Sequence, residues 1–260
     1  MTVPIVRTRQ LHLQIGNRVL CDQLNLSVTA GQRLAVLGQN GSGKTTLLHA
    51  LLKLGPTDED RIEIDGRPLS SWSRAELAKR VGILFQDSHD DMPATVQETV
   101  MLGRLPHLPA WRWESEQDLA LAEQALKTVG LEQLARRDVG SLSGGERQRL
   151  AIASLLTQAP TLYLLDEPSN HLDISFQIKT LSLLSDTVKR DNGALIMATH
   201  DINLAARFCD QVLLLHGGGA YTLGAQADVL TDTILSDAYD CDIRHVNTDC
   251  GRFFYPGDKL

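Results

Sequence analysis

Eight residues in the first fifth of the chain join three glycines to a lysine and a threonine, in the order Gly38-Gln-Asn-Gly-Ser-Gly-Lys-Thr45. They match the pattern G-x-x-x-x-G-K-[ST], which a chain of this length would contain by chance roughly once in a hundred. Glycines let successive backbone N–H groups turn toward an anion. Lys44 can then reach the outer phosphates of a nucleotide, while the Thr45 hydroxyl ligates Mg²⁺. The segment therefore predicts a phosphate-binding loop.

Two adjacent acids, Asp166 and Glu167, follow the apolar run Leu162–Leu165. At the carboxyl end of a buried strand, Asp166 is placed to hold Mg²⁺. Glu167 beside it could polarise a water molecule for attack on a terminal phosphate. Acids are common at strand ends, so the pair takes its meaning from the phosphate-binding loop upstream.

A third segment, Leu142–Arg149, has the sequence Leu-Ser-Gly-Gly-Glu-Arg-Gln-Arg and precedes an apolar helical stretch. Ser143, Gly144 and Gly145 at a helix start offer a second group of backbone N–H donors and a favourable dipole end. One nucleotide does not need two such helix ends from the same chain, so an ordinary serine N-cap is the alternative interpretation.

The elements around these motifs alternate between strand and helix. Residues 45–54 predict a helix directly after the loop, and five apolar runs predict the strands of a parallel sheet with covered faces. The five runs are Arg33–Leu37, Val81–Phe85, Leu162–Leu165, Ala194–Ala198 and Val212–Leu215.

The N-terminal and middle parts of the chain have other patterns. Alternation at residues 11, 13 and 15, and again at 24, 26 and 28, predicts two antiparallel strands joined by a turn at Gly16-Asn17. Residues 85–162 are instead mainly helical, with a capping box at Thr95–Glu98 and a helix after Ser115.

We expect one domain over residues 1–260. Residues 1–87 and 160–230 would form the catalytic core with its β subdomain, residues 88–159 a helical subdomain that contains Leu142–Arg149, and residues 231–260 a C-terminal extension.

Composition narrows the class of partner. The 25 Lys and Arg residues are outnumbered by 32 Asp and Glu residues, a net charge of −7 that argues against a nucleic-acid-binding protein. No apolar run approaches the roughly 18 residues of a spanning helix. The first ten residues show no signal-peptide pattern, so we expect a cytosolic chain.

Cys241, His245 and Cys250 could be metal ligands, but reduced cysteines without a metal are the simpler interpretation.

The order of the three motifs resembles that of the ATP-binding cassette (ABC) ATPases, and further residues fit the same family. Gln86 follows the predicted strand 81–85, residues 169–173 (Ser-Asn-His-Leu-Asp) follow the two acids, and His200 stands in Ala-Thr-His-Asp. The resemblance implies an α/β fold: a P-loop NTPase (RecA-like) parallel sheet core with an N-terminal antiparallel β subdomain and a helical insertion subdomain.

The resemblance also implies a homodimer packed head to tail, with each ATP between one subunit's phosphate loop and the partner's Ser143 segment. That arrangement would explain the second anion-binding helix start. Glu167, His200 and Gln86 are implied as catalytic, and Thr45, Gln86 and Asp166 as the Mg²⁺ site. The implied ATP contacts are Ile15, Gly38, Asn40, Gly41, Ser42, Gly43, Lys44, Thr45, Thr46, Ser143, Gly144, Gly145 and Asp173. Ile15 stands where the family usually has an aromatic residue that stacks on adenine.

A finer resemblance is to the ATPase subunits of metal-chelate importers, through residues 103–107, 172–174, 201–210 and 251–256. It implies uptake of cobalamin, haem or an iron–siderophore across the inner membrane, with the ATPase peripheral on the cytoplasmic face. The implied partners are two integral-membrane permease subunits, which bind a groove beside the helical insertion, and indirectly a periplasmic substrate-binding protein. The alternatives are a soluble ABC ATPase of an Fe–S assembly complex and an ABC exporter component.

Overall fold

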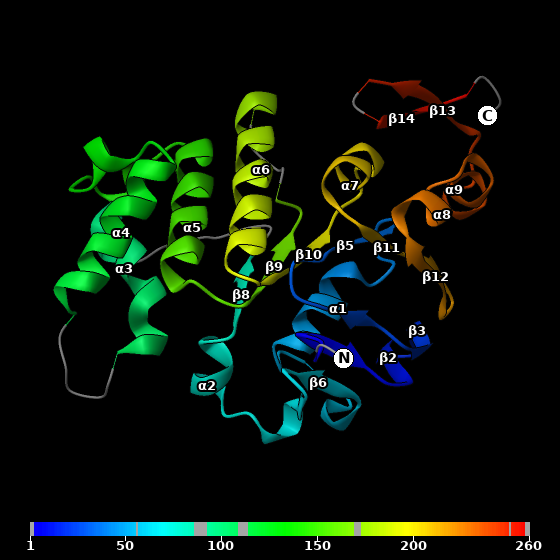
Figure 1. The fold of residues 1–260 in the computed structure, drawn as a ribbon, viewed down its shortest axis with the longest axis horizontal. Helices are drawn as coiled ribbons and strands as arrows, with labels where there is room; N and C mark the ends of the chain where they lie inside the picture. Colours follow the sequence, from blue (N-terminus) through cyan, green and yellow to red (C-terminus); the bar gives the residue numbers. More distant parts are fainter. Residues whose placement is uncertain are drawn as a thin grey trace.

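A six-stranded sheet runs through the centre of the protein, with helices on both of its faces (Figure 1). The computed structural model describes residues 3–55, 57–85, 93–108, 114–168, 173–249 and 251–257. The strand order is β12-β11-β5-β10-β9-β8, and every neighbouring pair is parallel except β11 and β12. The strands are β5 (Arg33–Gly38), β8 (Val81–Leu84), β9 (Leu162–Asp166), β10 (Ala194–Ala198), β11 (Gln211–Gly217) and β12 (Ala220–Ala225). Each of the five predicted apolar runs supplies one strand, as expected for a sheet covered on both faces.

The two faces of the sheet bury separate cores. On β5, Ala35 and Leu37 face the cluster that includes α6 (Ile174–Arg190) and α7 (Ile202–Phe208). Leu34 and Val36 face the cluster that includes α1 (Lys44–Leu51) and the N-terminal strands. This alternation follows from the two-residue period of a strand.

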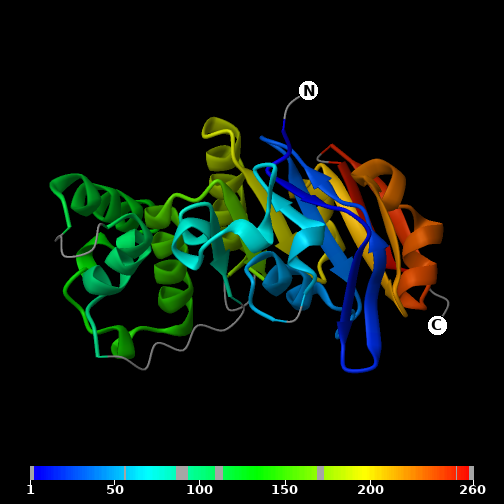
Figure 2. The ribbon, with the colours of Figure 1, turned by 90° about the horizontal axis from the view of Figure 1, so that it is seen from below.

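The N-terminal region forms two small antiparallel structures, which Figure 2 shows beside the sheet. One is a sheet in the order β4-β1-β6-β7, and the other is the hairpin β2–β3. The strands are β1 (Val6–Thr8), β2 (Leu11–Ile15), β3 (Arg18–Leu24), β4 (Ser27–Val28), β6 (Ile62–Ile64) and β7 (Arg67–Pro68), followed by α2 (Arg74–Ala78).

One strand assignment from the sequence was wrong. The Gly16-Asn17 turn joins β2 to residues 18–24, not to a strand over residues 24–28. Residues 27 and 28 pair instead with β1 in the neighbouring sheet. The alternation of Leu24, Leu26 and Val28 reports their burial, but burial does not reveal which of two adjacent sheets a strand joins.

The helical region contains α3 (Val96–Met101), α4 (Glu116–Thr128) and α5 (Gly144–Gln158), with the short 3₁₀ helix η3 (Leu102–His107) between α3 and α4. The predicted capping box at Thr95 and Glu98 is confirmed, and Ser115 begins α4 as expected. Further 3₁₀ turns are η1 (Glu59–Arg61), η2 (Leu69–Ser71), η4 (Glu132–Leu134) and η5 (Val139–Ser141).

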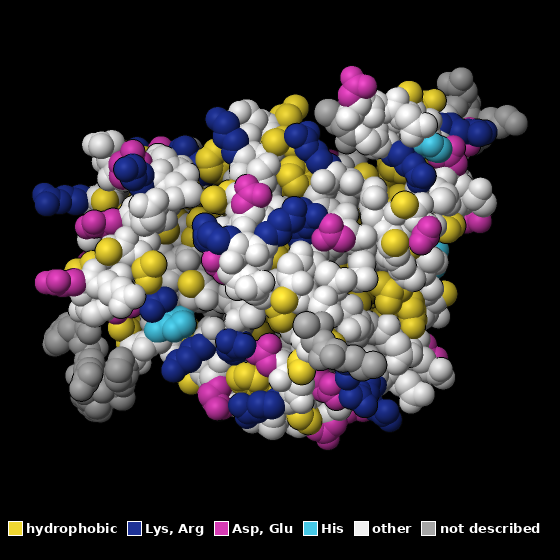
Figure 3. All heavy atoms as spheres, viewed as in Figure 1, with side chains coloured by type: hydrophobic (Ala, Val, Ile, Leu, Met, Phe, Trp, Pro, Cys, Tyr) yellow, Lys and Arg dark blue, Asp and Glu magenta, His cyan; other side chains and the backbone are white. Residues whose placement is uncertain are grey.

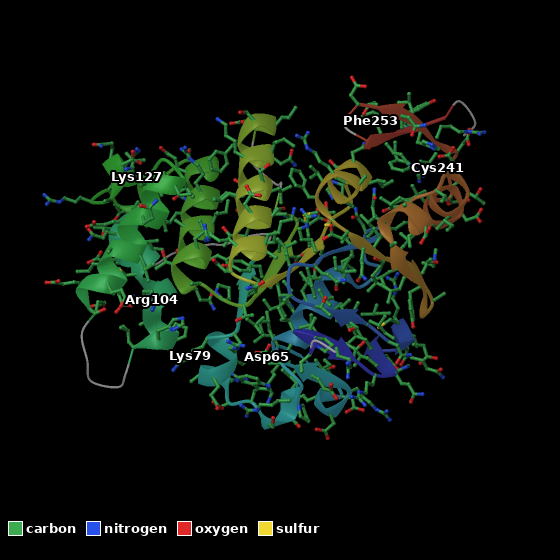
Figure 4. The ribbon with its side chains drawn as sticks, in the orientation of Figure 1. Asp65, Lys79, Arg104, Lys127, Cys241 and Phe253 are labelled. Carbon is green, nitrogen blue, oxygen red and sulfur yellow. The ribbon has the colours of Figure 1, made fainter. Side chains whose placement is uncertain are left out.

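Residues 103–107, which belong to η3, pack against the C-terminal end of α5. A methyl group on Gly103 would lie 2.3 Å from the Ser154 carbonyl oxygen, so only glycine allows this approach. Arg104 donates to the Thr157 carbonyl and to Asp118, at 2.7 Å for the latter, and a His107 ring nitrogen lies 2.9 Å from the Gln158 carbonyl oxygen. Figure 4 shows Arg104 among these helices.

The C-terminal part comprises α8 (Gln226–Val229), α9 (Asp232–Tyr239) and the hairpin of β13 (Ile243–Thr248) and β14 (Gly251–Pro256). Asn203 at the start of α7 exchanges two hydrogen bonds with the Phe254 backbone, which fastens the hairpin to that helix. Cys241 lies where α9 leads into the hairpin, and Phe253 lies on the hairpin (Figure 4). The domain boundaries expected at residues 88, 160 and 231 stay predictions.

Candidate functional site

The loop between β5 and α1 is a tight backbone cradle. Gly38, Gly41 and Gly43 all have positive φ, in the region that favours glycine. A methyl group on Gly38 would lie 2.6 Å from Ser42 Oγ and 2.7 Å from the Leu215 carbonyl oxygen. The Ser42 hydroxyl is itself buried and has no hydrogen-bond partner among the described residues. An unpartnered buried hydroxyl in such a cradle suits a polar ligand at this loop.

Lys44 points into the site from the first turn of α1. Its Nζ donates to the Gly38 carbonyl oxygen at 2.9 Å and lies 3.9 Å from Oε1 of Glu167. Burial lowers the pKa of the Lys44 ammonium, and the nearby Glu167 and Asp166 carboxylates oppose that shift. Lys44 is therefore a buried cation between a carbonyl oxygen and a carboxylate, and it can bind a more highly charged anion such as a phosphate group.

The two acids lie at the carboxyl end of β9, where Asp166 contacts the phosphate loop. The Thr45 hydroxyl donates to Asp166 Oδ1 at 3.1 Å. Only 2% of Asp166 is exposed, and this burial raises the pKa of its carboxyl group. A hydroxyl and a buried carboxylate side by side are oxygen ligands of the type Mg²⁺ prefers.

Glu167 and His200 form a hydrogen-bonded pair beside Lys44. A Glu167 carboxylate oxygen lies 2.8 Å from Nδ1 of His200. Glu167 has φ of 47°, a left-handed conformation that is uncommon for residues other than glycine. The Glu167 N–H donates to the Ala198 carbonyl oxygen and stabilises this turn. Such strain is often found at functional sites, where the surrounding structure enforces it.

Lys44, Glu167 and His200 line a cavity of about 800 Å³, whereas Ser42 and Asp166 do not reach its wall. Ten of the residues expected from the sequence contribute to its wall: Ile15, Gly38, Asn40, Gly41, Gly43, Lys44, Thr45, Thr46, Glu167 and His200. Four others that line it were missed: Arg18, Leu20, Gln39 and Tyr239. Arg18 could have been found, because the Gly16-Asn17 turn places it opposite Ile15. Tyr239 lies about 200 residues further along the chain, on α9, and no local sequence pattern predicts that it lines the cavity.

The second anion-binding segment lies apart from this cavity. Ser143 caps α5, accepting a hydrogen bond from the Glu146 N–H, while the Glu146 carboxylate accepts from the Ser143 N–H and hydroxyl. In the described part of the chain, a methyl group on Gly144 would meet no atom within 4 Å, so this helix start is open to that extent. Ser143, Gly144, Gly145 and Asp173 do not line the cavity. Asp173 is the N-cap of α6.

Two of the expected sites fall outside the described residues. Gln86 and residues 169–172 are not among the residues the structure describes, nor is Cys250. Of the other two candidate C-terminal ligands, His245 lies 2.6 Å from a carboxylate oxygen of Asp232. Within the described ranges, no three His, Cys, Asp or Glu side chains gather as a metal-binding group.

The amino-acid sequence is similar to known proteins along most of its length. Residues 21–170 match the family model described as ABC transporter. The chain is 36% identical over 242 residues to the ferric enterobactin transport ATP-binding protein FepC of Escherichia coli K12, covering 92% of this chain and 89% of FepC. It is 37% identical over 230 residues to the hemin import ATP-binding protein HmuV of Streptomyces coelicolor, covering 88% of this chain and 81% of HmuV.

A further relative is longer than this chain. The cobalamin import ATP-binding protein BtuD of Halobacterium salinarum is 37% identical over 234 residues, which are 90% of this chain. The match spans only 58% of BtuD, so the chain covers little more than half of that relative's length.

A solved structure of a putative metal-chelate type ABC transporter in an inward-facing conformation has the same fold. It superposes with a TM-score of 0.83 at 29% identity, over 97% of both chains. In the described part of the chain, no helix is both long and apolar enough to cross a membrane. The family match over more than half of the chain, with relatives similar along most of its length, shows that this protein belongs to the ABC transporter family.

Proposed function

We propose that the protein binds and hydrolyses ATP to drive an importer of a metal chelate: cobalamin, haem or an iron–siderophore. It would act as a homodimer on two integral-membrane permease subunits at the cytoplasmic face of the inner membrane, served by a periplasmic substrate-binding protein. The observation that carries the ATPase part is the meeting of Lys44, Glu167 and His200 at one cavity. Asp166 lies just behind the cavity wall, hydrogen-bonded to the lining residue Thr45. The importer part rests on the names of the similar proteins.

ATP would lie along the phosphate loop, with its outer phosphates at Lys44 and the N-terminus of α1. The loop's N–H groups and the helix dipole favour negative charge there. The 3.9 Å gap between Lys44 and Glu167 means that the lysine is not committed to a tight ion pair. Thr45 and Asp166 would hold Mg²⁺, with Gln86 as a further ligand. Bound there, Mg²⁺ neutralises charge that develops on the phosphates.

Glu167 would act as the general base on the attacking water. Its carboxylate lies at the edge of the cavity and is oriented by His200 at 2.8 Å. Since His200 is also exposed in part, its free side can face the terminal phosphate while Nδ1 holds the acid. A base fixed by a second group and aimed into a phosphate site is the arrangement that hydrolysis requires.

The separation of Ser143 from its own chain's cavity supports the homodimer. An open helix start with a serine and two glycines suits an anion, yet this chain's nucleotide would lie elsewhere. In a head-to-tail dimer, Ser143, Gly144 and Gly145 of each subunit would contact the terminal phosphate of the other subunit's ATP. Loss of that phosphate would loosen the pair, a switching mode known in other nucleotide-binding proteins.

A groove between the core and the helical region supports the permease contact. A hollow of about 280 Å³ there is lined by Leu52, Leu54, Arg74, Leu77, Ala78, Val81, Ile83 and Gln158. On the nearby η3, the side chains of Leu102 and Leu105 are 54% and 58% exposed. Exposed apolar residues beside a groove suit a helix of a membrane partner.

The test is reconstitution with the candidate permease. The purified chain should hydrolyse ATP only with Mg²⁺, and in proteoliposomes with its permease it should drive accumulation of one of the three chelates. Recovery of the chain from cells in a soluble Fe–S assembly complex, with no ATP-dependent chelate uptake, would contradict the importer assignment.

A further inference from the structure

The hairpin β2–β3 carries an apolar and a basic side chain to the rim of the nucleotide cavity. Ile15 and Arg18 stand opposite each other beside the turn, and both line the 800 Å³ cavity. Ile15 is 53% exposed and also lines an adjoining hollow of about 140 Å³. The hairpin tip projects from the body in Figure 2.

The Arg18 side chain has no partner among the described residues, unlike Lys44 in the same cavity. Within the described residues it makes neither a hydrogen bond nor an ion pair, whereas Lys44 in the same cavity does both. A guanidinium offers five N–H donors and a flat, weakly hydrated face that stacks on aromatic rings. A free guanidinium on a cavity wall is therefore available to a ligand.

The backbone aims this side chain at the phosphate loop. A methyl group on Gly41 would lie 3.4 Å from Nη1 of Arg18. Leu20, two residues on, packs on the same loop, because a methyl group on Gly43 would lie 2.9 Å from its Cβ. The pairing of β2 with β3 skips Leu20, since Leu13 faces Cys21 and Gln14 faces Val19. A bulge of this type redirects the side chains beside it.

We propose that Arg18 is a nucleotide-binding residue whose guanidinium stacks on the base of ATP. It would supply the flat contact that an aromatic residue would give and that the branched Ile15 side chain cannot. Ile15 then packs against the edge of the base from across the hairpin. This inference rests on the proposed ATP binding, and it names a contact to the base that is separate from the phosphate groups.

Binding of Mg·ATP and of Mg·tripolyphosphate, which has no base, tests the proposal by calorimetry. Arg18→Ala should weaken ATP binding about tenfold, the size of one base-stacking contact, and change tripolyphosphate binding less than about twofold. Arg18→Lys keeps the charge but loses the plane, so it should resemble Arg18→Ala. Arg136→Ala, which removes another exposed arginine without a partner among the described residues, is the matched control and should bind as the wild type does.

A rescue variant separates stacking from a structural effect. Ile15→Tyr in the Arg18→Ala background should restore most of the lost ATP affinity, because tyrosine supplies the missing flat surface. Three results would each overturn the proposal: unchanged ATP affinity in Arg18→Ala, equal weakening of tripolyphosphate, or no rescue by Ile15→Tyr. Failure of the wild-type protein to bind ATP would instead refute the proposed function itself.

Discussion

Replacing Glu167 by Gln is the sharpest test of the catalytic arrangement. The change keeps the shape of the side chain and one oxygen that can hydrogen-bond to His200. In the wild-type protein, the Glu167 carboxylate oxygen lies 2.8 Å from His200 Nδ1. It removes the negative charge 3.9 Å from Lys44 Nζ and the ability to take a proton from water. Hydrolysis and binding should therefore respond in different directions.

The expected loss of turnover is large. A positioned general base contributes about 10²- to 10⁴-fold to a rate, so kcat for Glu167→Gln should fall by at least about a hundredfold. That corresponds to about 3 kcal/mol or more on the activation barrier.

Nucleotide affinity should stay the same or rise. Two unit charges 3.9 Å apart attract by about 4 kcal/mol at an effective dielectric constant of 20, before desolvation is counted. Without the negative charge of Glu167, the Lys44 ammonium is attracted to the bound phosphate alone. The ATP-bound dimer should accumulate, because the phosphate that joins the subunits is no longer removed.

Phosphate release measures hydrolysis, and light scattering with Mg·ATP measures dimer formation on the same sample. Glu123→Gln on the exposed side of α4 is a matched control and should change neither. Turnover by Glu167→Gln within tenfold of the wild type would refute the role of Glu167 as base. Loss of ATP binding in a folded variant would refute the electrostatic reasoning.

Two further predictions concern the helical region. Gly103→Ala places a methyl group 2.3 Å from the Ser154 carbonyl oxygen and should cost about 1–3 kcal/mol of unfolding free energy in a urea titration. Gly144→Ala, which meets no atom of the described residues within 4 Å, should leave that free energy unchanged yet weaken the ATP-dependent dimer. Equal destabilisation by both variants would contradict the packing argument. Hydrogen bonds from Ser115 and then Arg104 lower the pKa of Asp118 from its ordinary 3.8 to about 2. Since the folded-state pKa is the lower one, this carboxylate stabilises the fold above pH 4 and loses that contribution as the pH falls toward 2. Asp118→Asn should therefore flatten the decline of the urea midpoint between pH 4 and pH 2, and an unchanged slope would contradict the assignment.

The secondary structure and the phosphate loop were predictable because local rules govern both. All five apolar runs became strands of one sheet, and Thr95 and Ser115 began helices as capping residues do. The pairing of residues 24–28 was not predictable from alternation, because two small sheets lie within reach of the same stretch. Likewise, Arg104 and His107 stood in a recognisable pattern, but only the packing of η3 on α5 gave them a structural role.

The sequence by itself determined the chemistry available at the site: a glycine loop followed by a lysine and a threonine, two acids after a buried strand, and a histidine at the end of another. Parallel strands place their carboxyl ends at one edge of a sheet, so these residues had to meet there. Only the tertiary structure decided which side chains close the cavity around them. Tyr239 reaches the loop from a helix about 200 residues further along the chain, and a contact of this range depends on packing that no local pattern encodes.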